Sequence, residues 1–288
     1  MSSPRISASS YSNTAPLVWS FQYGSRRGSV ELILDTAPAR SAELLAQKRV
    51  SAALVPVIAF QTIPDALLIP DVCVGALERV QSVCLVTNGK DLRDVKSVAL
   101  DVSSKTSIAL TRIIFREFLG FEPDFKPAEP NIDAMLAESD CALLIGDPAL
   151  SISDSGLGIG DLSTRGEAFQ NSKSEITNHN SEIRKYDLVE LWREFTGFGF
   201  VFAMWMTTQD QIEINFAGAR DEGLGHLEEI IANYGSEIPL TRDQFKQYLS
   251  SNISYSIDDS MQKGLELYFQ LAQKNGLIER AAPLRFVG

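Results

Sequence analysis

The chain has 288 residues, 44% of them hydrophobic, and this length is enough for two cores of ordinary domain size. Its formal net charge of −11 argues against a nucleic-acid partner, because phosphate binding needs concentrated Lys and Arg, and the chain shows no such run. The apolar stretches fall far short of the roughly 20 residues that span a bilayer, and the N-terminus is polar. We therefore expect a cytoplasmic protein with no membrane partner.

Cysteine and histidine are too few and too scattered to suggest a metal centre or a histidine-based triad. Cys73, Cys84 and Cys141 stand singly in apolar segments, which predicts buried reduced thiols. His179 and His226 have no partner at metal-ligand spacing. The expected protein therefore has no metal and no cofactor.

The first part of the chain alternates apolar runs with helix-forming segments. Its pattern predicts a strand, a polar loop, a short helix, a second strand, a second helix and a buried parallel strand, at residues 5–9, 11–16, 17–21, 30–35, 41–48 and 52–57. Much of this order returns about 90 residues later. The second copy consists of a strand, a polar loop, a helix that ends at Gly120, an extended segment, a short helix after Asn131 and a buried strand, at residues 97–102, 103–107, 108–119, 123–127, 132–138 and 141–147.

Matching the two copies pairs the loop around Asn13 with the loop at 103–107. Both loops follow the carboxyl ends of parallel strands, which is where open α/β sheets bind ligands. Two such sheets facing one another would form a cleft with a helix N-terminus on each wall. A single doubly wound sheet without a cleft is the alternative.

Two β-rich runs, at 82–87 and 200–207, are interpreted as crossovers between lobes. They predict a first lobe of residues 1–87 and 206–288 and a second lobe of residues 88–205. Four helices then follow at 209–220, 225–234, 241–249 and 258–275, the third opening with a Thr-x-x-Gln capping pattern at Thr241. The polar stretch at about 151–185 has few large apolar groups and is interpreted as a surface insertion, with a lid as the alternative.

Several strings, taken in order, resemble one known family, chorismate dehydratase: RISASSYSNTAPLVWSF, AALVPVIAF, RVQSVCLVT, ALDVSSKTSIALTRIIF, ALLIGDPAL and YDLVELWREFTGFGFVFAMW. The resemblance covers nearly the whole chain apart from the insertion. It implies an α/β, two-lobed type II periplasmic-binding-protein-like fold with a ligand cleft between the lobes. It also implies a cytoplasmic hydro-lyase that eliminates water from the dianion chorismate to give 3-[(1-carboxyvinyl)oxy]benzoate in the futalosine route of menaquinone biosynthesis.

The resemblance further implies the site residues: Asn13 as the catalytic residue, and Ser82, Ser104, Thr106, Ser107, Gly146 and Asp147 as substrate-binding residues. Read without it, the Ser/Thr cluster is an ordinary helix cap and Asn13 a turn residue. Asp147 is either a structural loop-former or a general base. We hypothesise that a carboxylate of the substrate itself takes the proton, because the loops offer no His or Glu pair. An exported solute-binding protein and a non-catalytic sensor of small anions stay as alternatives.

Overall fold

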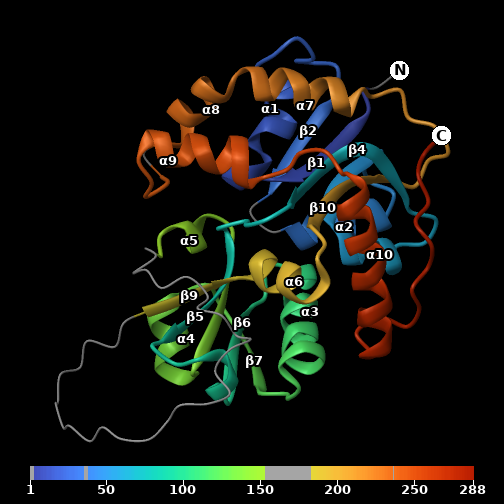
Figure 1. The fold of residues 1–288 in the computed structure, drawn as a ribbon. Helices are drawn as coiled ribbons and strands as arrows, with labels where there is room; N and C mark the ends of the chain where they lie inside the picture. The colour runs from blue at the N-terminus through green and yellow to red at the C-terminus, as the bar shows by residue number, and fades with distance from the viewer. Residues whose placement is uncertain (1–2, 36–37, 153–182, 236) are drawn as a thin grey trace, which may run out of the picture.

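Two lobes, each built around a five-stranded sheet, make up the fold (Figure 1). The computed structural model describes residues 3–35, 38–152, 183–235 and 237–288. The first sheet has the order β2-β1-β3-β10-β4, with β1 Arg5–Ser9, β2 Glu31–Asp35, β3 Ala52–Pro56, β4 Leu67–Ala76 and β10 Phe200–Thr207. The second has the order β7-β6-β8-β5-β9, with β5 Val83–Asn88, β6 Ser97–Asp101, β7 Asp124–Ala128, β8 Cys141–Ile145 and β9 Ile183–Asp187. The prediction of two lobes is confirmed, and the single doubly wound sheet is wrong.

The internal repeat predicted from the sequence is present as a repeat of topology. In the first sheet β1 pairs in parallel with β2 and β3, and in the second β6 pairs in parallel with β7 and β8. An antiparallel strand follows in each case: β10 lies between β3 and β4, and β5 lies between β8 and β9. In each lobe, the parallel strands therefore lead at their carboxyl ends into the polar loops that the sequence repeat pairs, around Asn13 in the first lobe and after residue 102 in the second.

The predicted lobe boundaries need correction. The runs at 82–87 and 200–207 are not free crossovers, because β5 belongs to the second sheet and β10 to the first. The chain therefore changes lobe in the short connections 77–82 and 197–199, rather than at 87/88 and 205/206. A buried apolar run has the same composition in a central strand as in a buried crossover, so only the pairing distinguishes them.

Two further strands differ from the prediction. The 67–76 segment forms β4 although no strand is predicted there, since Pro70 and Gly75 interrupt the apolar run; as an edge strand, β4 tolerates the proline. Residues 183–185 belong to β9, which pairs with β5, and not to the polar insertion. The rest of that insertion, 153–182 with His179, lies outside the described residues, so both insertion and lid stay predictions.

The helices of the first lobe are α1 Ala15–Gln22, α2 Pro38–Ala46, α7 Phe216–Gly225, α8 Leu227–Tyr234, α9 Arg242–Gln247 and α10 Asp259–Lys274. Those of the second are α3 Lys105–Ile113, α4 Ile132–Glu138, α5 Asp147–Leu150 and α6 Leu188–Thr196. The capping box at Thr241 is confirmed. The helix predicted at 209–220 is wrong in its start, because Asn215 caps α7 only at Phe216. Short 3-10 turns lie at Ser12–Thr14, Val57–Gln61 and Leu92–Asp94, and π-helical turns at Ile114–Leu119 and Tyr248–Asn252.

One hydrophobic cluster runs through both lobes, and a smaller one lies behind the second sheet. Strand alternation divides them, since Val83 and Leu85 face the large cluster whereas Cys84 and Val86 face the small one.

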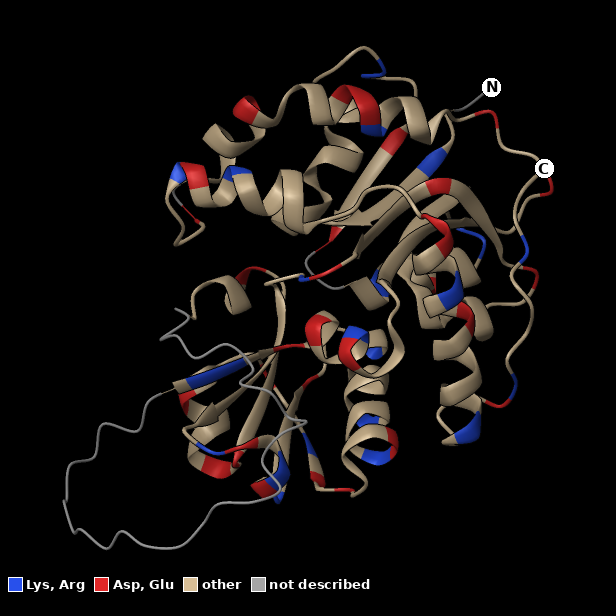
Figure 2. Ribbon diagram, in the orientation of Figure 1, with Lys and Arg blue, Asp and Glu red and all other residues tan. Residues whose placement is uncertain are grey.

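All three cysteines are buried free thiols, as predicted. Figure 2 shows acidic and basic residues interspersed along both lobes. None of the described helices is long and apolar enough to cross a bilayer.

Candidate active site

A small cavity of about 60 Å³ lies where the two lobes meet. The first lobe contributes Asn13 and Thr14, and the second contributes Ser104, Ser107 and Gly146. Ser82, at the end of the connection between the lobes, lines the same cavity. The structure therefore brings together five of the residues selected from the sequence: Asn13, Ser82, Ser104, Ser107 and Gly146.

The walls of this cavity carry no side chain that is charged at neutral pH, among the residues that the structure describes. Tyr11 is the titratable side chain on the wall, and burial raises its pKa, with Asp101 and Asp147 raising it further and Ser103 opposing them. Hydroxyl groups, the Asn13 amide and backbone N–H groups are thus the polar groups available to a ligand. An anion bound here would be held by dipoles and not by a side-chain cation.

Asn13 lies in the 3-10 turn Ser12–Thr14, which runs directly into α1. The Thr14 hydroxyl donates to the carbonyl oxygens of Ser9 and Tyr11, at 2.6 and 2.8 Å, and so fixes the turn to the end of β1. Pro16 in the first turn of α1 has no N–H to leave unpaired there. This local chemistry places the amide of Asn13 at the carboxyl edge of the first sheet.

The opposite wall is the N-terminus of α3. Ser104 caps it: its hydroxyl accepts from the Ser107 N–H at 3.3 Å and lies 3.1 Å from the Ser107 hydroxyl. The helix starts at Lys105 and not at residue 108, so the last three residues of the predicted loop 103–107 belong to the helix. The cap places two hydroxyls and the first N–H groups of a helix beside the cavity, an arrangement that attracts a carboxylate.

Thr106 does not line the cavity and instead joins the lobes. Its hydroxyl accepts from the Ile58 N–H of the first lobe at 3.3 Å, and its carbonyl accepts from the Tyr268 hydroxyl on α10 at 3.1 Å. The side chain is fully buried. The structure thus places Thr106 in the contact between lobes, next to the serines that face the cavity.

Gly146 and Asp147 follow β8, and only the glycine faces the cavity. Gly146 has φ +70°, and a Cβ there would lie 3.0 Å from the Tyr11 ring, so the position requires glycine. Asp147 accepts from the Ser12 N–H at 3.2 Å and from the Ser12 hydroxyl, which links the second lobe to the first. Burial raises the pKa of Asp147, the bonds from Ser12 lower it, and Glu237 raises it further.

Two tyrosines at the site were not selected from the sequence. Tyr11 packs against Gly146 across the lobe boundary. Tyr248, fully buried, begins the π-helical turn Tyr248–Asn252; burial raises the pKa of its hydroxyl, and interaction with Ser82 and Asn13 opposes that rise. Turns of this kind are frequent at functional sites. Nothing in the local sequence signals that Tyr248 meets residues so far away along the chain.

Metal ligands do not gather anywhere in the described ranges, where no group of three His, Cys, Asp or Glu side chains is placed to hold an ion. His226 stacks on Trp19 with ring centroids 3.9 Å apart, and its Nδ1 lies 2.8 Å from the Glu222 carbonyl oxygen. Its contacts are those of a packed side chain of the first lobe.

The cavity is several times smaller than the roughly 300–1,000 Å³ typical of small-molecule sites. Hydrogen bonds at Thr106 and Asp147 hold its two walls together. A ligand of the size of a substituted ring therefore requires the lobes to part, as in hinge closure of other two-lobed proteins.

Comparison with known proteins decides the family. The sequence profile of the family described as menaquinone biosynthesis matches residues 4–274. The chain belongs to this menaquinone biosynthesis family. A Thermus thermophilus protein named chorismate dehydratase is 28% identical over 269 residues, which are 90% of this chain and 91% of that protein. The resemblance drawn from the sequence strings is confirmed.

Solved structures place this member of the menaquinone biosynthesis family among periplasmic-binding-protein-like folds. A crystal structure of an Archaeoglobus fulgidus protein matches with a TM-score of 0.68 and 15% identity, covering 96% of this chain and 98% of that chain. The periplasmic aliphatic sulphonate binding protein of Escherichia coli matches with a TM-score of 0.61 and 14% identity, covering 99% and 94%. At these identities the likeness concerns the fold, and the predicted fold class is confirmed.

Proposed function

We propose that this chain is a chorismate dehydratase, a lyase that converts chorismate to 3-[(1-carboxyvinyl)oxy]benzoate and water. Membership of the menaquinone biosynthesis family supports the proposal, as does the similarity to the Thermus thermophilus protein over nine-tenths of the chain. The location of Asn13, Ser82 and Ser104 on one cavity between the lobes supports it independently.

The observation that carries the mechanism is the uncharged wall of that cavity. Elimination of water needs a base, and no described residue on the wall is an Asp, Glu or His. One carboxylate of the substrate therefore takes the proton from the ring carbon that bears the ether oxygen. The neighbouring hydroxyl leaves with its bonding electrons, is protonated to water, and the ring becomes aromatic. The protein then acts mainly by orientation, which can contribute several kcal/mol to lowering a barrier.

Each wall has a role in this scheme. The hydroxyls of Ser104 and Ser107, with the first N–H groups of α3, receive one carboxylate. The Asn13 amide, which both donates and accepts, orients the leaving hydroxyl. Ser82 contacts the substrate from the connection between lobes. We assign Thr106 and Asp147 to holding the lobes together, because both bond across the boundary and neither faces the cavity.

A binding protein without chemistry is the second candidate, since a sulphonate-binding protein has the same fold. Incubation of the pure protein with chorismate, without metal or nucleotide, distinguishes the two. A dehydratase yields a product lighter by one water, identified by mass, and changes the ultraviolet spectrum to that of a substituted benzoate. Binding of chorismate with an unchanged spectrum would reject the proposed reaction.

A further inference from the structure

The connection that carries Ser82 contains a strained turn. At Gln81 φ is +63°, and the Ser82 N–H donates to the Val80 carbonyl oxygen at 2.8 Å. A bond between residues two apart around a positive φ is that of a classic γ-turn, which is rare and unfavourable for a residue with a side chain. Such a conformation persists only where the surrounding structure holds it.

The turn lies between two cavities. Val80 and Ser82 line the cavity between the lobes. Arg79 and Gln81 line a separate polar cavity of about 430 Å³ on the other side of the connection. If the turn relaxed toward ordinary extended backbone, the bond from the Ser82 N–H to the Val80 carbonyl oxygen would break and these residues would move apart, so Ser82 would lose its fixed position on the cavity wall.

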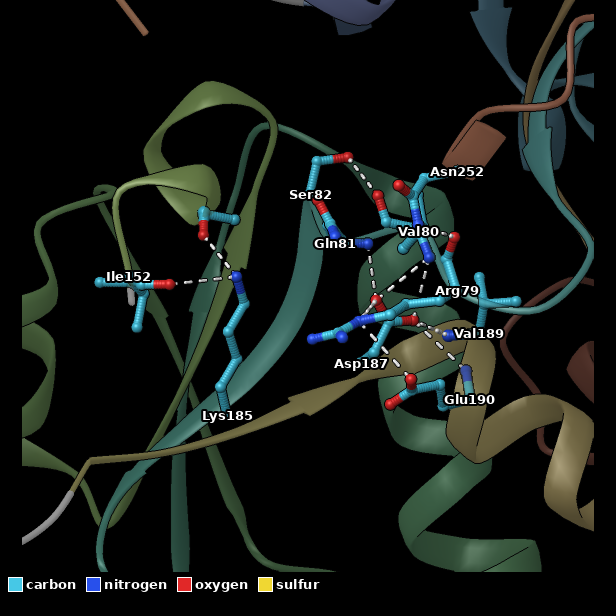
Figure 3. Close-up of polar contacts among 11 residues, drawn as sticks. Arg79, Val80, Gln81, Ser82, Ile152, Lys185, Asp187, Val189, Glu190 and Asn252 are labelled. Atoms are coloured by element: carbon cyan, nitrogen blue, oxygen red, sulfur yellow. Dashed lines mark hydrogen bonds and ion pairs between the residues drawn. The ribbon is translucent and has the colours of Figure 1, made fainter. Parts of the chain in front are cut away.

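Asp187 is the group that holds the turn (Figure 3). Its carboxylate is 2% exposed and accepts from the N–H groups of Val80, at 3.1 Å, and Gln81, at 2.6 Å. The same carboxylate accepts from the N–H groups of Val189, at 2.9 Å, and Glu190, at 3.3 Å, in the first turn of α6. An ordinary helix cap explains the second pair of bonds but not the first.

Neighbouring contacts fasten the same connection at other points. Arg193 on α6 donates to the Leu77 carbonyl at 3.0 Å, and Asn252 donates to the Arg79 carbonyl at 3.4 Å. Arg79, the charged side chain facing Asp187, has its Nε 4.0 Å from that carboxylate and 3.5 Å from Glu190. Beyond the turn, the Gly146 N–H donates to the Ser82 carbonyl at 2.7 Å. The turn thus connects α6 to Ser82 and Gly146, two residues that line the cavity.

We infer that Asp187 is a positioning residue, which holds the γ-turn at Gln81 so that Ser82 faces the substrate. It does not touch the substrate and acts through Ser82. The inference rests on the proposed function only where turnover is the measurement. In Asp187→Asn the amide oxygen still accepts hydrogen bonds but the NH2 group that replaces the other carboxylate oxygen cannot, so one pair of N–H groups loses its partner.

The first experiment is a double-mutant cycle on chorismate turnover. Asp187→Asn should lower kcat/KM by about 10–100-fold, as expected when a reacting group is misplaced. In the Ser82→Ala background the same change should lower kcat/KM by less than about threefold, because the two residues act as one unit. Fully additive effects of the two changes would overturn the inference.

Gln81→Gly gives a second, conservative test. Glycine adopts a positive φ without strain, so Gln81→Gly in the Asp187→Asn background should recover about tenfold of the lost kcat/KM. Failure to recover any activity, with the double variant folded, would overturn the inference. Asp258→Asn is the matched control: Asp258 caps α10 through the Met261 N–H at 2.8 Å, away from the cavity, and Asn caps helices as well as Asp, so this change should leave kcat/KM unchanged.

Amide hydrogen exchange of the full-length protein tests the turn without reference to catalysis. Asp187→Asn should raise the exchange rates of the Ser82 and Gly146 amides at least about tenfold, and Gln81→Gly should restore part of the protection. Unchanged exchange at both amides would overturn the inference. If the wild-type protein leaves chorismate unconverted but these amides respond as described, the proposed function fails while the role of Asp187 in the turn stands.

Discussion

Asn13 and Asp147 lie close together at the lobe boundary, yet the structure predicts very different effects of replacing them. Asn13→Ala removes the amide that lines the cavity and leaves the neighbouring walls in place. Removing one preorganised polar group that meets the reacting centre typically lowers kcat about 10²–10³-fold, or about 3–4 kcal/mol. We therefore expect Asn13→Ala to be almost inactive while it unfolds nearly as the wild type does.

Asp147→Asn changes a contact between lobes and not a wall of the cavity. Its carboxylate accepts two bonds from Ser12. A bond to a charged group contributes about 1.5–3 kcal/mol and a neutral one about 0.5–1.5, so the exchange weakens each of the two bonds by about 1–1.5 kcal/mol, or the contact by about 2–3 kcal/mol. Relief from burying the charge offsets about 1–2 kcal/mol of that loss. Closure of the lobes then changes by about tenfold, since 1.4 kcal/mol is a factor of ten.

Initial rates of chorismate loss, followed by the ultraviolet spectrum at several substrate concentrations, give kcat and kcat/KM for both variants. Asp147→Asn should keep at least about a tenth of the wild-type kcat/KM, by the same conversion. An inactive Asp147→Asn beside an active Asn13→Ala would refute the reasoning, because it would make Asp147 the base and remove the need for a substrate carboxylate.

Three further variants test other parts of the site. Gly146→Ala places a Cβ 3.0 Å from the Tyr11 ring at φ +70° and ψ −147°, so urea unfolding should show a loss of about 1–3 kcal/mol, and KM should rise. Thr106→Val leaves the buried Ile58 N–H unpaired, and the loss of about 1–3 kcal/mol should lower the thermal midpoint with kcat little changed. Burial raises the pKa of Asp101, so its protonated form favours the fold and this contribution is lost as pH rises through the folded pKa. Asp101→Asn should therefore gain stability relative to wild type as the pH increases from about 4 to 7, and a constant difference in urea unfolding would contradict the stated direction of the shift.

Much of the fold follows from local chemistry that the sequence displays. Buried apolar runs predict β3 and β8, the Ser104 cap marks the start of α3, and the polar loop before Pro16 marks the start of α1. The repeat of these signals predicts two similar sheets. The lobe boundaries are not predictable in the same way, because β5 and β10 are central strands whose partners are set by tertiary contacts.

In the site, too, local sequence patterns predict some of the residues, and tertiary contacts determine the others. Asn13, Ser104 and Gly146 sit at strand ends or helix starts, positions that pattern reasoning can find, and they line one cavity. Thr106 shares the helix start but turns toward the other lobe, since an α-helix rotates each successive side chain by about a quarter turn. Tyr248 comes from a distant part of the chain and has no local signature. Its nearness to Ser82 and Asn13 requires the assembled fold.

The position of β10 has a consequence for synthesis on the ribosome. The second lobe's five strands all come from one continuous stretch, residues 83–187, whereas the first sheet needs β10, from residues 200–207, between β3 and β4. Until translation passes residue 207, β3 and β4 cannot reach their common neighbour and both expose an unpaired edge. Synthesis of the first lobe therefore begins earlier, but its sheet is completed only after all strands of the second lobe have been synthesised and have had time to fold.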